Sequence, residues 1–206
     1  MPGPRAVLFD LDGVLVNSYE AWFKLVNLAT RHFCKSDVER DRFHDCWGQG
    51  IEVDLREFFP GCNAAEIERF YDEHLLDFDS CIEADADAAA TLQRLRDEEI
   101  ARAVVTNTPT PLARDILALT GLIGLVDLTV GAMSDLASKP APDLIVHACR
   151  ELDVEPAETL VVGDSRFDEE AARAANAPFV GFRTEDGHGV STLPDLVDRV
   201  LSQLGS

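Results

Sequence analysis

The sequence predicts a doubly wound α/β protein, in which a parallel sheet is covered by helices on both faces. Three short apolar segments are expected to form the central strands, and each ends abruptly in small or polar residues; they span residues 6–9, 103–105 and 160–162. Their apolar residues are continuous rather than alternating, which is the pattern of parallel strands buried on both faces. Helical patterns separate the three segments, and this alternation is typical of doubly wound sheets.

The remaining core elements follow the same alternation. Weaker strands are predicted at residues 128–130 and 179–182. Apolar residues keep helical spacing at residues 144–152 and 196–204, and another helix is expected to begin within DSRFDEEAARAA, which starts at residue 164. In sheets of this kind, ligands bind outside the carboxyl ends of the strands. The polar ends of the three central strands should therefore face one crevice.

One stretch, from about residue 18 to residue 80, is helical without a clear strand. Two amphipathic helices are predicted there, because apolar residues lie on one face at residues 22–33 and again at residues 67–75. Between them, WGQGIEVD is expected to be a loop that enters a third helix, and FFPGCN a turn. We therefore predict a core domain of residues 1–17 and 82–206 and a helical cap domain of residues 18–81.

Composition narrows the class of function. The 206 residues suffice for one core and a smaller accessory domain, and the absence of a long apolar run or signal pattern predicts a cytoplasmic protein. A formal net charge of −20 argues against nucleic acid and membrane surfaces as partners, since both are bound through clustered basic residues. Because salt screens distant charges, a small phosphorylated substrate is not excluded. The five cysteines form no Cys-x-x-Cys pair and are expected to be reduced thiols.

The first candidate residues are Asp10 and Asp12 in FDLDGVLVNS, directly after the first strand. Each could be a helix N-cap or part of an Asx turn, and Gly13 supports a turn. A reaction that needs one nucleophilic or metal-binding carboxylate at a strand end, and a second carboxylate to carry a proton, would also place two aspartates here. The pair by itself leaves both interpretations open.

Asp164 and Asp168 form a second acidic pair, after the strand at residues 160–162. Oxygen-rich clusters of this kind suit Mg²⁺, which binds through one or two carboxylates together with water and substrate phosphate. The alternative is capping of the following helix by Asp164 or Ser165, with Asp168 favourable in its first turn. Capping and metal binding can coexist at such a site.

Thr106, Asn107 and Lys139 are candidates for contacts with phosphate. Thr106 and Asn107 offer a hydroxyl, an amide and backbone N–H groups at a strand end, as an oxyanion cradle requires. TNTPTP is also rich in turn formers, and a plain turn is the simpler interpretation. Lys139, in SKPAPD, is the only lysine beyond residue 35 and could place a positive charge on phosphate. The alternative for Lys139 is a solvated surface side chain.

The order of these motifs is more specific than any one of them. DLDGVLVNS, VVTNT, the lysine of SKPAPD and VVGDSRFDEEAA resemble the four successive motifs of the haloacid dehalogenase (HAD) superfamily. Within it, the chain is similar to the phosphatase branch related to phosphoglycolate phosphatase and β-phosphoglucomutase. The resemblance implies a Rossmann-like doubly wound parallel sheet core with an inserted α-helical cap, in the position of the helical stretch described above.

The resemblance also implies a role for each candidate residue. Asp10 would attack phosphorus to form an aspartyl-phosphate, and Asp12 would protonate the leaving oxygen and then activate water. Thr106, with Asn107 nearby, would bind the phosphoryl oxygens, and Lys139 would stabilise the charge that builds up there. Mg²⁺ would be bound by Asp10, the main-chain carbonyl of Asp12, Asp164 and, indirectly or through water, Asp168.

The function implied is a Mg²⁺-dependent phosphomonoester hydrolase that acts on a small phosphorylated metabolite. Asp12 favours phosphate chemistry, since dehalogenases and phosphonatases of the superfamily lack the second aspartate. The alternative enzyme is a phosphosugar mutase of the β-phosphoglucomutase type. That type usually has an arginine in the cap loop, where this chain has GQGIEVD, and the first arginine here, Arg56, comes later, inside a predicted helix. The non-enzymatic alternative is a HAD-like binding protein or a receiver-type signalling protein.

Substrate contacts from the cap are expected at three loop residues, Gly48, Gln49 and Gly50. Specificity is also expected to depend on Trp47 and residues 51–54, with Trp22 and Arg56 as further candidates. The sequence indicates neither the substrate nor the oligomeric state.

Overall fold

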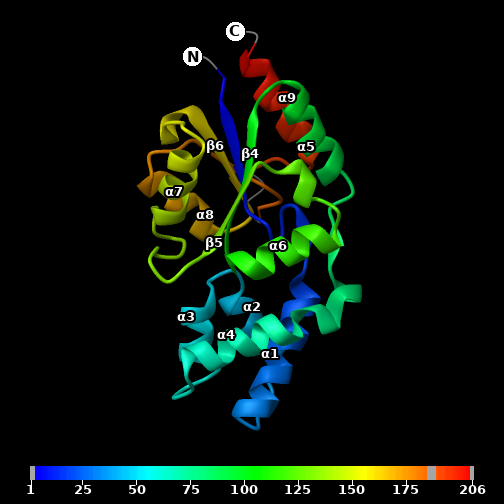
Figure 1. Cartoon of the computed structure of the whole chain (residues 1–206), viewed down its shortest axis with the longest axis vertical. Coiled ribbons are helices and arrows are strands. Elements are labelled where there is room, and N and C mark those ends of the chain that lie inside the picture. The colour runs from blue at the N-terminus through cyan, green and yellow to red at the C-terminus, as the bar shows by residue number, and fades with distance from the viewer. Residues whose placement is uncertain (1–2, 185–188, 205–206) are drawn as a thin grey trace.

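The computed structural model describes residues 3–184 and 189–204, and its centre is a parallel five-stranded sheet in the order β5-β4-β1-β6-β7 (Figure 1). All four strand pairs are parallel, and Phe9 at the end of β1 lies beside Val104 and Val162. The strands are β1 (Ala6–Phe9), β4 (Ala101–Pro109), β5 (Leu128–Ala132), β6 (Thr159–Gly163) and β7 (Phe179–Gly181). The five strands expected from the apolar segments are therefore confirmed.

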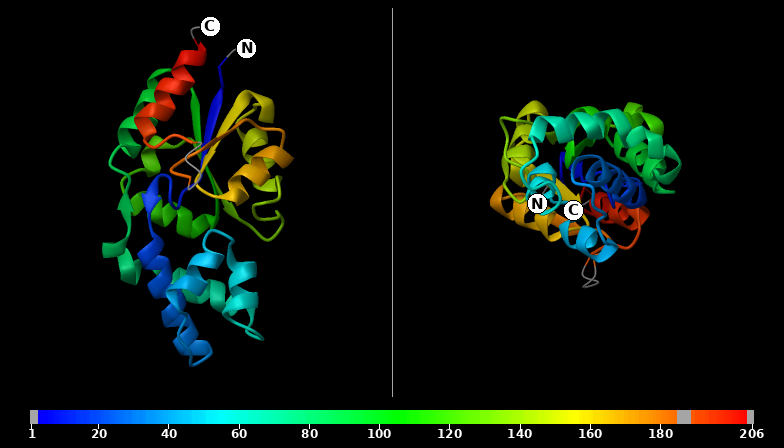
Figure 2. Two further views of the ribbon diagram at one scale, coloured as in Figure 1. Left: turned by 180° about the vertical axis from the view of Figure 1, so that it is seen from behind. Right: turned by 90° about the horizontal axis from the view of Figure 1, so that it is seen from below.

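Helices cover both faces of this sheet. Successive residues of β1 point to opposite faces and therefore pack against different helices. Ala6 and Leu8 pack in the apolar cluster that contains α7 and α8, whereas Val7 and Phe9 pack in the cluster that contains α5, α6 and α9. Figure 2 shows these two groups of helices on opposite sides of the sheet. These elements are α5 (Ala88–Asp97), α6 (Thr110–Leu119), α7 (Asp143–Glu151), α8 (Arg166–Ala174) and α9 (Leu193–Leu204), with the short helices η2 (Ile123–Leu125) and η3 (Pro156–Glu158) in the connections. The predicted fold class is confirmed.

The helical stretch after the first strand forms a separate layer of helices below the carboxyl ends of the strands (Figure 1). We refer to residues 18–81 as the cap segment. Its elements are α1 (Tyr19–Phe33), α2 (Arg40–Cys46), α3 (Ile51–Glu57), α4 (Ala64–His74) and η1 (Leu75–Cys81). Two short strands, β2 (Val16–Asn17) and β3 (Glu83–Ala84), pair antiparallel where the chain enters and leaves this segment. The pairing joins the two connections at the base of the cap segment.

Helix α2 and the β2–β3 pair have no counterpart in the sequence prediction. Helix α2 buries only Phe43, so its seven residues carry no apolar periodicity. The two strands have two residues each, which is too short for an alternating pattern. The three helices predicted in this stretch, which correspond to α1, α3 and α4, are present.

The expectation of a plain turn at TNTPTP is wrong. Strand β4 continues through this segment to Pro109, where it pairs with Ala132 of β5 after an irregularity in the register, and α6 follows at once. The turn-forming side chains are used inside the strand: the Thr108 backbone N–H donates to Thr106 Oγ1 at 3.1 Å. Their polar groups are thus satisfied without a reversal of the chain.

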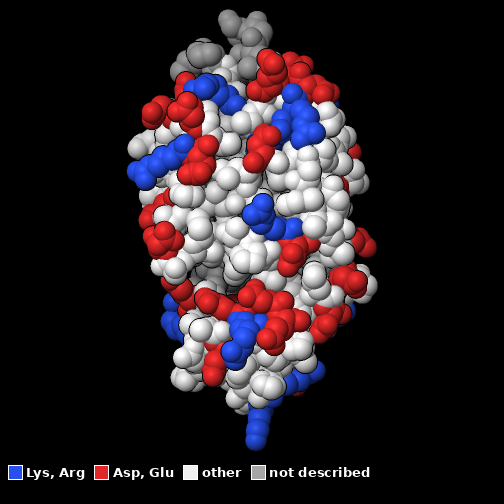
Figure 3. All heavy atoms as spheres, in the orientation of Figure 1, with Lys and Arg blue, Asp and Glu red and all other residues white. Residues whose placement is uncertain are grey.

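Over the described residues, no helix is long and apolar enough to cross a membrane. On the face shown in Figure 3, basic side chains are scattered among acidic ones rather than gathered in one patch. The five cysteines are all free thiols.

Candidate active site

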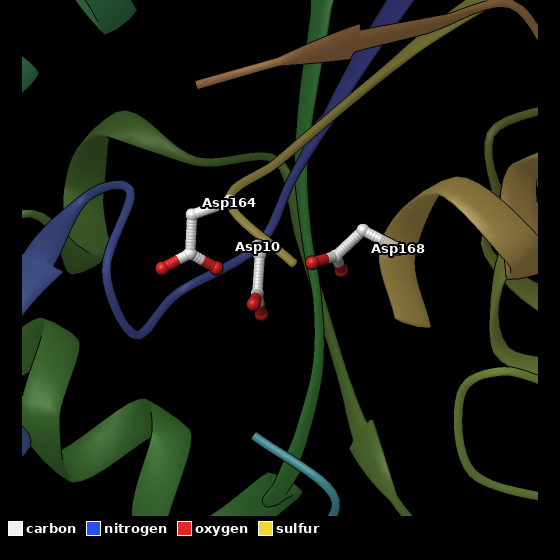
Figure 4. Close-up of side chains that lie close together, drawn as sticks. All are labelled: Asp10, Asp164 and Asp168. Atoms are coloured by element: carbon white, nitrogen blue, oxygen red, sulfur yellow. The ribbon is translucent and has the colours of Figure 1, made fainter. Parts of the chain in front are cut away.

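Three carboxylates meet where the carboxyl ends of β1 and β6 lie side by side (Figure 4). Asp10 follows β1, Asp164 follows β6, and Asp168 lies in the first turn of α8; one oxygen from each lies within 4.8 Å of the others. The polar ends of the strands thus face one site, as the parallel order of the sheet requires.

Gly13 allows the chain to turn away immediately after Asp12. Its φ is +88°, in the region that favours glycine, and its N–H donates to Val16 O at 2.8 Å. A Cβ at this position would lie 1.9 Å from Asp164 Oδ2. The close approach of the backbone is what lets the Asp10 and Asp164 segments share one site.

Asp10 has one anchored oxygen and one free oxygen. Its Oδ1 accepts a hydrogen bond from the Leu11 N–H at 2.7 Å and lies 2.9 Å from Lys139 Nζ. Among the described residues, no protein group donates to Oδ2. Burial raises the pKa of Asp10 well above its ordinary value, and Lys139 only partly opposes this. The free oxygen is therefore available to a phosphorus atom or a metal ion.

Lys139 is buried, so the alternative of a solvated surface side chain is wrong. Its three ammonium hydrogens have three acceptors: Asp168 Oδ1 at 2.5 Å, Asp10 Oδ1 at 2.9 Å and Val105 O at 3.1 Å. Burial disfavours its charge, but Asp10 and Asp168 outweigh burial and raise the pKa of Lys139. The ammonium is thus fixed beside the carboxylate that the motif predicted as nucleophile.

Asn107 holds the segment that carries this lysine. Its Oδ1 accepts the Lys139 backbone N–H at 2.8 Å, and its Nδ2 donates to the carbonyl oxygens of Lys139 at 3.1 Å and Gly48 at 2.9 Å. The side-chain amide is committed to main-chain groups. Asn107 therefore ties the lysine loop to the cap segment, and a contact with phosphate would have to come from its backbone.

Helix α8 positions Asp168 through a reciprocal cap. Ser165 is the N-cap residue: Asp168 Oδ2 accepts from its N–H at 3.2 Å and from its hydroxyl, while Oδ1 accepts from Lys139. Both oxygens of Asp168 are thus engaged by the protein. Asp164 is less constrained, and burial, followed by the charge of Asp168, raises its pKa to about 7.

Asp12 lies apart from this cluster, at the junction with the cap segment. Its Oδ1 accepts the Ser18 hydroxyl and the Trp22 indole N–H, the latter at 3.3 Å, and its Oδ2 accepts the Thr108 hydroxyl at 2.7 Å. Two hydroxyls and one indole therefore orient this carboxylate. A hydroxyl can donate or accept, so Ser18 and Thr108 can hold Asp12 in either its ionised or its protonated form.

A pocket opens from Asp10 towards the cap segment. It is lined from the core by Asp10, Asp12 and residues 106–109, and from the cap segment by aromatic and apolar side chains with the backbone of Gly48 and Gly50. The predicted cap residue Gln49 is not part of this lining, because its amide donates to the Asp45 carbonyl at 2.8 Å.

Sequence reasoning did not identify Ser18 and Thr108, which bond to Asp12, or Tyr71, which lines the pocket, as site residues. Thr108 had a signal, since it stands two residues after Thr106 in a strand and therefore points to the same side. Ser18 and Tyr71 reach the site only through the packing of the cap segment, and no local pattern marks them.

Comparison with known proteins is consistent with this geometry. The model of the family described as haloacid dehalogenase-like hydrolase matches residues 7–182. A plasmid-encoded phosphoglycolate phosphatase of Cupriavidus necator is 31% identical over 180 residues, which cover 84% of this chain and 78% of that protein. The phosphoglycolate phosphatase of Colwellia psychrerythraea is 29% identical over 190 residues, covering 86% of this chain and 83% of that protein.

Solved structures share the fold at lower identity. CbbY of Rhodobacter sphaeroides, in complex with xylulose-(1,5)bisphosphate, superposes with a TM-score of 0.81 at 21% identity and covers 94% of this chain and 96% of its own. A HAD-superfamily hydrolase of Geobacter sulfurreducens gives a TM-score of 0.71 at 22% identity, covering 97% and 98%. These structures agree with the fold described above.

Proposed function

The chain belongs to the haloacid dehalogenase-like hydrolases, and on that premise we propose that it is a Mg²⁺-dependent phosphomonoesterase for a small phosphorylated metabolite. One observation carries the proposal: two aspartates one residue apart are held in different surroundings. Asp10 lies against Lys139 with one oxygen free, whereas Asp12 is held by hydroxyl and indole groups at the cap junction. The first suits a nucleophile and the second an acid–base group.

The geometry supports a two-step reaction. In the first step an oxygen of Asp10 bonds to phosphorus, the bond from phosphorus to the alcohol oxygen breaks, and Asp12 gives its proton to that oxygen. In the second step Asp12 takes a proton from water as the water oxygen attacks phosphorus, and the bond to Asp10 breaks. Inorganic phosphate is released, and Asp12 is again protonated.

Two further groups would stabilise the transferred phosphoryl group. Lys139 contributes a fixed positive charge beside Asp10. Thr106 Oγ1 accepts a hydrogen bond from the Thr108 N–H, so its own hydrogen is free to bind a phosphoryl oxygen. Preorganised donors of this kind act where negative charge develops in the transition state.

The residues present fit Mg²⁺. Three carboxylates converge, with the Lys139 ammonium between Asp10 and Asp168. Burial and mutual repulsion raise the pKa values of Asp10 and Asp164, and a divalent cation would offset both effects. Asp10 and Asp164 would hold the ion, with the Asp12 main-chain carbonyl that the family resemblance implies. Asp168 would act through Lys139 and Ser165, which already occupy its oxygens. When bound, the ion would neutralise charge on phosphate.

The alternatives have less support. A phosphosugar mutase must hold a second phosphate, and the pocket lining of the described residues includes no lysine, arginine or histidine. A receiver-type signalling protein is at odds with the hydrolase family to which residues 7–182 belong. A family member that only binds a partner would release no phosphate from any ester.

The proposal is tested by phosphate release from a panel of phosphate esters with Mg²⁺ or with a chelator. Asp10→Asn should abolish turnover of every ester. Asp12→Asn should slow alkyl phosphates by about 10²–10⁴-fold, the usual contribution of a general acid. It should slow the first step with p-nitrophenyl phosphate less, measured as a burst of nitrophenolate, because that leaving group needs no proton; the second step, which is common to all esters, should be slowed equally. Full activity of Asp10→Asn would show that the nucleophile is another group.

A further inference from the structure

The pocket that receives the leaving alcohol is lined mainly by aromatic and apolar side chains. The rings of Trp22 and Tyr71 meet edge to face with centroids 5.7 Å apart, and Phe43, Trp47 and Ile51 complete the wall contributed by the cap segment. Trp22 also donates to Asp12, so this wall begins at the group proposed to protonate the leaving oxygen. The alcohol part of the substrate must therefore lie among these side chains.

Asp54 is the one acidic side chain that the cap segment adds to this lining. Its Oδ2 accepts the Tyr71 hydroxyl at 3.0 Å, and no other described group hydrogen-bonds to its carboxyl. Burial raises the pKa of Asp54 to about 7, and the bond from Tyr71 only partly opposes this. A carboxyl with an unused oxygen thus faces the space that the alcohol would occupy.

No positive charge in the described part of the chain balances Asp54 within the pocket. The lining contains no lysine, arginine or histidine. Lys139 has its three hydrogens engaged at the phosphate end, and Arg56, in the same helix as Asp54, is exposed and bonds to Glu57. An anionic group on the alcohol would meet a carboxyl and ring faces, and nothing there would neutralise it.

We propose that the substrate is a phosphorylated amino alcohol, and that Asp54 selects its ammonium group. An ammonium complements this lining, because a carboxylate and the faces of aromatic rings both attract cations. The inference rests on the proposed phosphatase function and adds the class of the leaving group. It separates this chain from the relatives named phosphoglycolate phosphatase, since the glycolate part of that ester carries a carboxylate.

Three esters with two-carbon chains test the inference: O-phosphoethanolamine ends in an ammonium group, 2-hydroxyethyl phosphate in a hydroxyl group, and 2-phosphoglycolate in a carboxylate formed by its second carbon. At pH 8, above the raised pKa of Asp54, we expect kcat/KM to be about tenfold higher for the ammonium ester than for the hydroxyl ester, the scale of one cation–π or ion-pair contact in a partly desolvated site. The carboxylate ester should be slower than the hydroxyl ester by about 100-fold, because like charges in close contact are strongly unfavourable.

Variants at Asp54 separate selection from folding. Asp54→Asn should bring the ratio of the ammonium to the hydroxyl ester close to one and should raise the relative rate of the carboxylate ester. Asp54→Glu, which keeps the charge, should retain the wild-type order. Asp79→Asn, a change at an exposed aspartate of η1 in the same cap segment, serves as the matched control and should also retain it. A purely structural role of Asp54 would lower all three rates by the same factor.

The outcomes distinguish this inference from the function on which it rests. If the three esters and p-nitrophenyl phosphate all release no phosphate, the proposed function fails and the inference fails with it. If they are hydrolysed in an Asp10-dependent reaction but the hydroxyl or carboxylate ester is preferred, only the inference is overturned. An order that Asp54→Asn leaves unchanged would also overturn it.

Discussion

Asp54 allows a test of the pocket electrostatics that needs no substrate. Burial raises its pKa from the ordinary value of 3.8 to about 7, so between these values the folded protein keeps a proton that the unfolded chain has released. The free energy of unfolding must then fall as the pH rises through this range. The contribution of the raised Asp54 pKa to the free energy of unfolding is fully present below about pH 4 and is lost above about pH 7.

The magnitude follows from the two pKa values. Their difference corresponds to about 4 kcal/mol, and about 3 kcal/mol of it would be lost between pH 5 and pH 8. The Asp54 carboxyl faces the pocket rather than the packed core, so water reduces its desolvation. We therefore expect the free energy of unfolding to fall by about 1–2 kcal/mol between pH 5 and pH 8. Urea denaturation of the wild type and of Asp54→Asn measures it. The variant does not titrate, so its stability relative to the wild type should rise by that amount from pH 5 to pH 8.

The matched control is Asp79→Asn, a change at an exposed aspartate of η1 in the same cap segment. Its stability relative to the wild type should be the same at both pH values. If Asp54→Asn behaved like this control, the Asp54 carboxyl would not be held protonated by burial, and the reasoning from desolvation would be refuted.

Three other predictions concern the core of the site. Gly13→Ala places a Cβ 1.9 Å from Asp164 Oδ2 at a positive φ, so it should cost about 1–2 kcal/mol in backbone strain and lower phosphate release at least tenfold; wild-type rates would contradict the close approach. Lys139→Met leaves the buried carboxylates of Asp10 and Asp168 unpaired. It should lower the free energy of unfolding in urea by about 3–5 kcal/mol, with partial recovery in Mg²⁺. A variant as stable as the wild type would refute this. Asn107→Ala removes three hydrogen bonds and should lower the free energy of unfolding by about 1–3 kcal/mol; no change in the urea midpoint would count against the role assigned to the amide.

Much of the core was predictable because its signals are local. The continuous apolar segments indicate strands buried on both faces. Asp10 follows β1 and Asp164 follows β6, and the alternation of strands with helices was enough to place both at the carboxyl edge of the sheet. The start of helix α8 could be predicted from Ser165 and Asp168, which form the reciprocal cap. Helix α2, with one buried residue, gave no such signal.

The side-chain environments were less predictable. Lys139 looks like a surface lysine in a proline-rich loop, and its burial depends on Asp10 and Asp168, which lie far from it in the chain. Asn107 looks like a phosphate ligand or a turn residue, and its amide instead joins the lysine loop to Gly48. Both outcomes depend on which loops the fold brings together.

The sequence by itself determined the alternation of the core strands with helices and the identity of the acidic residues at the strand ends, because hydrophobic periodicity and motif spacing are properties of contiguous residues. The tertiary structure decided which oxygen of Asp10 is free, which groups hold Asp12, and the charge of the pocket around Asp54. These depend on burial and on contacts between different elements of the fold, such as Thr108 with Asp12 and Lys139 with Asp10. Such contacts set the desolvation and pairing of each charge, and they exist only once the chain has folded.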